Sequence, residues 1–339
     1  MNQTNRRQAL GSLLKLAGAV PLLGLTQARA AEFTIKCGTT LSTDHPLTKG
    51  VMRAAEQVRK TTAGRVDIQV FPNSQLGSQT DMMSQLRSGA LEMTAVSSVV
   101  LSTLTPLTAI SGVAYAFADY PDVWRVMDGE LGAYMRRSIE KSGIVVFDRI
   151  YNGGFYQMMS APKPILTAAD LSGFKIRVPP APIWVALYKA LGASPAAINW
   201  GEVYTALQTK IVDGVDSSVS NFSDSKLYEV QKYVSLTNHL WDGYWILSNR
   251  AAFERLSADL REVVRTAFNN EALTQRTEVE KVDAATVTKL EARGLKIARP
   301  DPASFQEMLR RNHYYADWKA KFGDEAWNLL QRSTAKTLA

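Results

Sequence analysis

The sequence predicts an α/β fold, because short apolar segments typical of strands alternate with segments of helical periodicity. The chain has 339 residues, of which 46% are apolar, so it can bury a core large enough for two domains. No linker-like, low-complexity or repeated segment separates an N-terminal half from a C-terminal half. We therefore expect two domains that exchange strands or helices.

The first strands and helices follow one another closely. Residues 33–38 and 65–71 alternate apolar and polar side chains, as half-buried strands do. Between them, residues 45–64 place Val51, Ala54 and Val58 at helical intervals and end on a glycine. A second helix over 79–89 leads to the apolar strand 91–98. Apolar strands joined by helices favour a largely parallel sheet that is covered on both faces.

The second half repeats this plan. We expect a helix at about 122–142, then strands over 143–150, 154–159 and 174–178. Two helices follow, over 182–192 and 201–210. In open α/β sheets ligands bind at the carboxyl ends of strands, so the loops after these strands are candidate binding segments.

The C-terminal part is predicted to be helical. Residues 252–293 keep a helical pattern for about forty residues, which is long for a globular helix. Either two helices meet near residues 269–272, or one helix spans both domains. A last helix is expected over 304–321.

The first thirty residues have the features of an export signal. Arg6 and Arg7 precede an apolar stretch of about ten residues, too short for a membrane span, and small residues surround a cleavage point before Ala31. The paired arginines indicate the twin-arginine route, with the general secretory route left open. We expect cleavage near residue 30 and an exported mature protein. Removing the four basic residues of this segment reduces the formal charge from +7 to +3.

Several functional classes are disfavoured. At +3, without a long basic stripe, the mature chain has no nucleic-acid footprint. His45, His239 and His313 show no metal-ligand spacing, and the lone Cys37 excludes thiolate clusters and internal disulfides. No phosphate-binding loop, nucleophile elbow or dinucleotide fingerprint occurs. We expect no cofactor, no metal, and Cys37 as a small buried side chain.

One charged residue lies in an unexpected place. Arg177 stands between Ile176 and Val178 at the end of a predicted buried strand, directly before a proline-rich turn. An unpaired charge there costs several kcal/mol. Arg177 therefore either reaches water along its aliphatic stem or pairs with an anion.

Aromatic residues collect in the second half of the chain. Trp184 and Tyr204 lie in predicted helices, and we expect both in the core. Tyr156, Trp200 and Phe222 lie at strand ends or in loops, where a ligand-facing role and a structural role are equally well supported.

Three segments together resemble the solute-binding proteins of tripartite ATP-independent periplasmic (TRAP) transporters, the DctP-like family. They cover residues 70–94, 173–222 and 227–256, in the family's order and spacing. The resemblance implies a two-lobed periplasmic binding protein fold, with a ligand cleft between the lobes and a long helix spanning both. Lobe I would comprise residues 31–153 and 243–282, and lobe II residues 154–242 and 283–339.

The resemblance also implies site residues. Arg177 falls on the arginine that makes a bidentate salt bridge to the ligand's carboxylate, which a planar guanidinium matches well. Trp200 falls on a residue that stacks on the ligand, and Ser217 stands where many members have asparagine. The remaining candidate ligand-binding residues are Tyr156, Phe222, Ser97, Ser98, Gln79, His239 and Trp241.

Tyr156 departs from the family pattern. Many members have an arginine here as a second contact to the acid, whereas this chain reads Gly-Phe-Tyr-Gln at residues 154–157. The loss of one cationic contact predicts a ligand with one carboxylate and an apolar or aromatic body.

The functional expectation is a binding protein without a chemical step, which delivers an organic acid to a TRAP permease and acts as a monomer. Two alternatives use the same scaffold. One is a ligand sensor for a membrane receptor. The other is an exported enzyme, whose catalytic groups would have to include His239 and Asp242.

Overall fold

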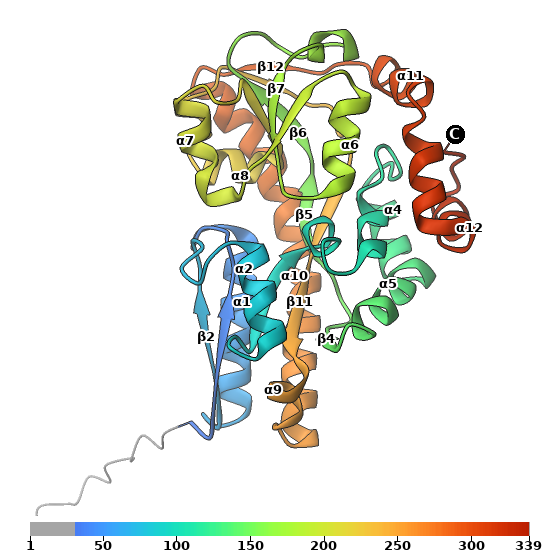
Figure 1. Ribbon diagram of the computed structural model, residues 1–339. Coiled ribbons are helices and arrows are strands. Elements are labelled where there is room, and N and C mark those ends of the chain that lie inside the picture. The colour runs from blue at the N-terminus through green and yellow to red at the C-terminus, as the bar shows by residue number, and fades with distance from the viewer. Residues whose placement is uncertain (1–30, 339) are drawn as a thin grey trace, which may run out of the picture. The chain divides into compact units, whose positions relative to one another are not determined.

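The computed structural model describes residues 31–338, so the expected export signal lies outside the described residues. The described chain is an α/β fold with two six-stranded sheets, which confirms the predicted fold class. Figure 1 shows the sheets in separate parts of the fold, connected by β5, β11 and α10. Within residues 31–338, no helix combines the length and the apolar character that a bilayer span requires.

The first sheet is mixed, whereas the sequence predicted a largely parallel one. Its order is β2-β1-β3-β11-β4, and β5 pairs with β11. Strand β1 runs parallel to β2 and β3, but β11 runs antiparallel to β3, β4 and β5, because it returns from the second sheet. The strands are β1 (Phe33–Gly38), β2 (Val66–Phe71), β3 (Met93–Ser97), β4 (Ile144–Val146), β5 (Tyr151–Phe155) and β11 (Trp241–Asn249).

Helices cover this sheet where the periodicity predicted them. The apolar residues Val51, Ala54 and Val58 of α1 are buried, as expected. The helices are α1 (Pro46–Thr61), α2 (Gln79–Ser88), α3 (Ser98–Leu101), the 3-10 helix η1 (Pro106–Gly112), α4 (Tyr120–Met127) and α5 (Glu130–Glu140). The single helix expected over 122–142 is thus two helices. The chain turns at Gly129, where a Cβ atom would lie 2.7 Å from the carbonyl oxygen of Arg125.

The second sheet is also mixed, with the order β12-β10-β6-β9-β7-β8. Strand β7 runs parallel to β8 and β9, and β6 runs antiparallel to β9 and β10. The strands are β6 (Gln157–Ser160), β7 (Lys175–Val178), β8 (Ser194–Ala197), β9 (Gly214–Ser217), β10 (Tyr233–Ser235) and β12 (Lys296–Ala298). The helices of this part are η2 (Ala168–Leu171), α6 (Pro182–Ala190), η3 (Trp200–Glu202), α7 (Val203–Gln208), α8 (Val219–Asp224) and η4 (Leu227–Glu229).

Three segments connect the two sheets. Strand β5 belongs to the first sheet and continues through Tyr156 into β6 of the second. Strands β10 and β11 make the return connection. After the short helix α9 (Arg250–Glu254), helix α10 (Ala258–Ala292) runs unbroken for 35 residues, about 50 Å. It is one helix without a break at residues 269–272, and it packs against α1, β5 and α8.

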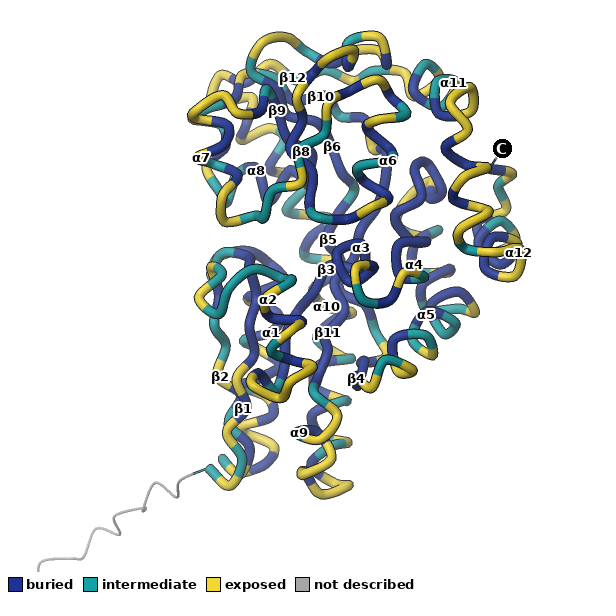
Figure 2. Tube along the Cα trace, in the orientation of Figure 1, coloured by how far each residue is buried: buried dark blue, intermediate teal, exposed yellow. Residues whose placement is uncertain are grey.

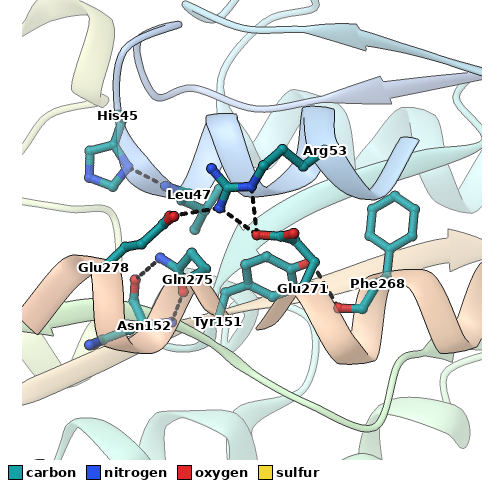
Figure 3. A network of polar contacts seen from close by, with 9 residues as sticks. All are labelled: His45, Leu47, Arg53, Tyr151, Asn152, Phe268, Glu271, Gln275 and Glu278. Carbon is teal, nitrogen blue, oxygen red and sulfur yellow. Dashed lines mark hydrogen bonds and ion pairs between the residues drawn. The ribbon is translucent and has the colours of Figure 1, made fainter. Parts of the chain in front are cut away.

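Polar contacts hold α10 against the first sheet, as Figure 3 shows. Arg53 on α1 donates to Glu271 and, at 2.6 Å, to Glu278. Gln275 accepts from the backbone N–H of Asn152 on β5 at 2.8 Å and donates to its carbonyl oxygen at 2.9 Å. The start of the connecting strand β5 is therefore bonded to the middle of α10.

The chain ends in two helices, α11 (Ala303–Arg311) and α12 (Tyr314–Thr334), where the sequence predicted one helix over 304–321. His313 separates them with a φ of 58°, which a continuing helix does not allow. Gly323, near the expected end, has a φ of 79° and kinks α12. Helix α12 packs against η1, α4 and α5.

The interior consists of three clusters of buried apolar residues, which follow the dark blue segments in Figure 2. Cys37 is fully buried, as predicted, and burial raises the pKa of its thiol to about 12. The lobe boundaries expected at 153/154, 242/243 and 282/283 fall inside β5, β11 and α10. These residue boundaries stay a prediction, since contacts within the described chain group it into one compact unit.

Candidate functional site

A small cavity lies where ends of strands from both sheets meet. Its free volume is about 20 Å³, enough for one water molecule. Three of its residues are at or next to the carboxyl ends of β3, β7 and β9. The lining residues are Gln79, Ser97, Val100, Tyr156, Arg177, Pro179, Trp200, Ser217, Asn221 and Tyr244. Six of the predicted site residues are therefore brought together: Arg177, Tyr156, Trp200, Ser217, Ser97 and Gln79.

Arg177 is the charged residue of the described cavity wall. It is the third residue of β7, and only 3% of its surface is exposed. Its Nε donates to the carbonyl oxygen of Ile198 at 2.8 Å, and its guanidinium lies 5.2 Å from the centre of the Trp200 ring. Within residues 31–338, no carboxylate oxygen lies within 4.0 Å of it. Burial lowers the pKa of Arg177 to about 10.

The first sheet supplies the wall around Ser97. Gln79 begins α2 next to a capping box formed by Ser78 and Asp81. The amide oxygen of Gln79 accepts from the backbone N–H of Ser97 at 2.7 Å. Tyr244 of β11 pairs with Ser97 in the sheet and completes this side.

The second sheet supplies the opposite wall. The hydroxyl of Ser217, at the end of β9, accepts from the side chain of Asn221 in α8 at 2.8 Å. Tyr156 is 5% exposed, and its ring packs against Trp184 at 5.0 Å. The Tyr156 hydroxyl has no hydrogen-bond partner among the described residues, so it is free to contact a ligand.

Two predicted aromatic site residues do not line the cavity. Phe222 is fully buried in α8 and belongs to the core of the second sheet. Its Ser- and Asn-rich surroundings suggested a loop, but they form a short helix that turns the ring inward. Trp241 is also fully buried, and its Nε1 donates to Asn152 at 2.9 Å.

Two predicted polar site residues are likewise turned away. The hydroxyl of Ser98 donates to the carbonyl of Thr108 at 3.0 Å and accepts from Trp245 Nε1 at 3.1 Å. His239 is bonded to Tyr188 at 3.1 Å and to Thr237 at 2.8 Å. Other residues of the fold therefore already occupy the hydrogen-bonding groups of Ser98 and His239.

The sequence did not single out four lining residues: Val100, Pro179, Asn221 and Tyr244. Pro179 directly follows the strand that carries Arg177, and Asn221 lies four residues after Ser217, so one helical turn brings them together. The sequence positions of Pro179 and Asn221 could therefore have indicated that they belong to the site. Tyr244 reaches the site only through the antiparallel pairing of β11 with β3.

Two buried carboxyl groups lie behind the cavity wall. Asp216, the neighbour of Ser217, accepts from Trp184 Nε1 and lies 3.5 Å from His239 Nε2. Asp242 on β11 accepts from the Ser97 hydroxyl. Burial raises the pKa of Asp242 to about 7. His239 thus contacts Asp216 and not Asp242, so the pair that the enzyme alternative required is not formed.

Trp184 is buried, as predicted, whereas Tyr204 is only partly buried and donates to Glu229 at 2.7 Å. Among residues 31–338, no group of three His, Cys, Asp or Glu side chains is arranged to hold a metal ion.

The cavity, the two mixed sheets and the connecting helix agree with a known family. The family model of DctP, a bacterial extracellular solute-binding protein of family 7, matches residues 37–319. The chain belongs to the DctP family. The resemblance seen in the three sequence segments is therefore confirmed.

Curated DctP relatives are similar over most of the chain. The C4-dicarboxylate-binding periplasmic protein DctP of Rhodobacter capsulatus is 34% identical over 266 residues, which cover 77% of this chain and 78% of that protein. An uncharacterized protein of Sinorhizobium fredii is 34% identical over 274 residues, 81% of this chain, and the match spans 50% of that protein's length.

Solved structures of TRAP periplasmic solute-binding proteins have the same fold. The protein from Sulfurospirillum deleyianum with bound succinate has a TM-score of 0.84 and 30% identity, covering 89% of this chain and 99% of that one. The protein from a Sulfitobacter species with bound β-D-galacturonate has a TM-score of 0.84 and 27% identity, covering 89% and 100%. Members of this fold thus hold acids of different size and charge.

Proposed function

We propose that this protein binds a small organic acid in the periplasm and delivers it to a TRAP-type permease, without a chemical step. The observation that carries the proposal is Arg177, a buried guanidinium that faces a cavity between two sheets and has no carboxylate partner in the described chain. A buried cation of this kind is stabilised by a bound anion. We also propose that the protein is exported through the twin-arginine or the secretory route and that it binds the acid as a monomer.

The ligand class follows from the charges around the cavity. Of the residues that line it, Arg177 is the one with a formal charge, so one carboxylate is neutralised. A second ligand carboxylate would approach the buried Asp216 behind the wall. The Tyr156 hydroxyl and the Trp200 ring favour a hydroxylated, apolar or aromatic remainder. We therefore propose a monocarboxylate.

Entry requires movement. A space of about 20 Å³ admits a water molecule, and an organic acid needs several times more. The wall residues come from two sheets joined by β5, β11 and α10, so separation of the sheets would open the cavity. Closure around the acid would then create the surface that the permease recognises.

A thermal-shift screen of residues 31–339 tests the proposal. The panel is pyruvate, D-galacturonate, benzoate and succinate, at concentrations up to a hundredfold above the expected dissociation constant. Saturation at that excess adds about 2.7 kcal/mol of stability, a clear rise in melting temperature. We expect a monocarboxylate to give the largest rise and to be recovered unchanged. No rise with any acid would contradict the binding function, and a larger rise with succinate would contradict the monocarboxylate class.

A further inference from the structure

A carboxyl group without an ion pair lies directly behind the cavity. Asp242 is the second residue of β11, and none of its surface is exposed. Among residues 31–338, no Lys, Arg or His nitrogen lies within 4.0 Å of its carboxyl oxygens. A buried carboxylate without a cation is costly, so this group has a reason to bind a proton.

The contacts of Asp242 link it to the cavity wall. The hydroxyl of Ser97 donates to its Oδ2, and the backbone N–H of Val99 donates to its Oδ1 at 3.4 Å. The oxygen of the same hydroxyl accepts from the N–H of Val100 at 3.3 Å. A serine hydroxyl has one hydrogen. While Asp242 is ionised, the hydrogen of Ser97 is therefore directed away from the cavity.

The surroundings of Asp242 carry little positive charge. Asp216 faces it from β9, Tyr244 from its own strand, and Tyr156 from the segment between β5 and β6. Arg177 lies across the same cavity and acts on both tyrosines. Burial, with a smaller contribution from the charge of Asp216, raises the pKa of the Asp242 carboxyl to about 7 against the opposing hydrogen bonds from Ser97 and Val99. Both protonation states are thus accessible near neutral pH.

We propose that Asp242 takes up a proton when an organic acid binds, and that it thereby positions Ser97 to donate a hydrogen bond to the ligand's carboxylate. This inference rests on the proposed binding function. The proton comes from solvent and resides on Asp242 Oδ2, which then donates to Ser97 Oγ. The Ser97 hydrogen turns into the cavity, while its oxygen accepts from Asp242 and Val100. Every donor and acceptor stays paired.

The direction of the effect follows from charge. An acid in the cavity adds a negative charge close to Asp242, which makes ionised Asp242 less favourable in the complex. Binding and protonation therefore promote each other. Above about pH 7, affinity should fall by up to about tenfold per pH unit, because a proton must be taken up with each ligand.

Calorimetry of residues 31–339 measures this proton directly. The most responsive acid among pyruvate, D-galacturonate, benzoate and succinate is titrated at pH 7 in buffers of different ionisation enthalpy, and again at pH 6 and pH 8.5. Wild type should take up about half a proton at pH 7 and more at pH 8.5, and it should bind about tenfold more weakly at pH 8.5 than at pH 7. Asp242→Asn should take up less, with a flatter pH profile. The ionisation of the acid itself contributes equally to both proteins.

Two further variants make the test specific. Asp283→Asn removes another aspartate whose pKa burial raises to about 7, but whose hydrogen-bond partners Tyr120 and Ser220 do not line this cavity, so it should keep the wild-type proton uptake. Ser97→Ala removes the hydroxyl that connects Asp242 to the ligand, so its proton uptake and pH dependence should be smaller than in wild type, with only the charge effect of the acid on Asp242 left. If Asp242→Asn does not fold, Ser97→Ala carries the test.

The outcomes separate this inference from the binding function. Equal proton uptake in wild type, Asp242→Asn and Ser97→Ala would overturn the role of Asp242 while leaving binding intact. If proton uptake disappears in Asp283→Asn, the proton binds to Asp283, and the proposed role of Asp242 is also overturned. Failure of all four acids to bind wild type would reject the proposed function, and this inference with it.

Discussion

At the scale of single residues, burial decides the properties of the charged groups. Arg177 lies between two core residues of β7, and its guanidinium is held by Ile198 and Trp200, whose backbone oxygen and ring are weaker partners than a carboxylate. The Nε contact fixes the plane of the guanidinium and leaves its two terminal nitrogens for a bidentate ligand. The arginine is thus oriented before a ligand binds.

We predict that Arg177→Ala weakens binding of the responsive acid by about 1.5–3 kcal/mol, roughly 10- to 150-fold, because a charge-assisted pair is lost. Arg177→Lys keeps the charge but loses the planar fork and the bond to Ile198, so we expect an intermediate loss. Calorimetry at pH 6.5 measures both. An affinity of Arg177→Ala equal to wild type would remove Arg177 from the site.

Asp283 on α10 should make stability depend on pH. It accepts from the Tyr120 hydroxyl and the Ser220 backbone N–H, both at 3.3 Å, and burial raises its pKa from 3.8 to about 7. The folded state therefore holds this proton more tightly than the unfolded state. Its stabilising contribution is complete below about pH 4 and is lost as pH rises through 7.

We predict that Asp283→Asn is more stable than wild type at pH 8, on the order of 1–2 kcal/mol, and that the advantage shrinks toward pH 5. Urea unfolding at both pH values measures the difference. A gap between variant and wild type that grew toward pH 5 would show the opposite sign and contradict the prediction.

At the scale of elements, hydrogen bonds join the connecting strand β5 to the long helix α10. Figure 3 shows Gln275 bridging to both backbone groups of Asn152, while the Tyr151 hydroxyl reaches the carbonyl of Phe268. Strand β5 pairs with β11 on one side, and on its other side these bonds to α10 provide partners for its backbone N–H and C=O groups. The side chain of Gln275 thus replaces a neighbouring strand.

We predict that Gln275→Leu lowers the free energy of unfolding by about 2–4 kcal/mol, because it leaves a buried N–H and a buried C=O of Asn152 without partners. The control is Leu273→Gln on the same helix, at a side chain that is 47% exposed, and it should change stability little. Urea unfolding compares the two. Equal effects would mean that the bridge contributes nothing specific.

Gly154 in β5 has both an unusual backbone and close neighbours. Its φ is 94°, and a Cβ atom there would lie 2.8 Å from Asp283 Oδ2 and 2.8 Å from Ser218 Cβ. Gly323 has a φ of 79° but open space around it. At both positions the positive φ would strain any residue that has a Cβ atom. Only at Gly154 would that Cβ atom also collide with neighbouring atoms.

We predict a loss of about 2–4 kcal/mol for Gly154→Ala and about 1 kcal/mol for Gly323→Ala, because only the first adds a collision to the strain. Thermal and urea unfolding of both variants give the comparison. Losses of equal size would show that the crowding at Gly154 relaxes freely.

At the scale of the whole molecule, the cavity is smaller than the acids that related proteins hold. Its walls come from two sheets, so the volume depends on how these sheets approach each other. We expect the acid-free protein in solution to hold the two sheets apart, so we predict that a saturating acid decreases the radius of gyration measured by small-angle X-ray scattering. Arg177→Ala at the same acid concentration is the control and should show a smaller decrease. An unchanged radius in wild type would contradict closure by sheet movement.

Local patterns predicted the elements well where one periodicity dominated. The strand predicted over 33–38, the helix over 45–64 and the strand over 174–178 agree with β1, α1 and β7. Breaks were missed where tertiary contacts or one backbone angle end a helix, as at Gly129 and His313. The prediction of a largely parallel sheet was wrong. The direction of a strand such as β11 depends on the side from which the chain re-enters the sheet, and no local sequence pattern shows this.

The sequence by itself determined the family, through three motifs in order, and it placed Arg177 at a strand end where a buried charge needs a partner. Only the tertiary structure decided which candidates surround that arginine. Phe222 and Trp241 enter the core, while Tyr244 and Asn221 join the cavity. The reason is physical: the direction and hydrogen-bond partners of a side chain depend on neighbours that are distant in sequence. The link from Asp242 to Ser97, which joins residues 145 positions apart, exists only in the folded chain.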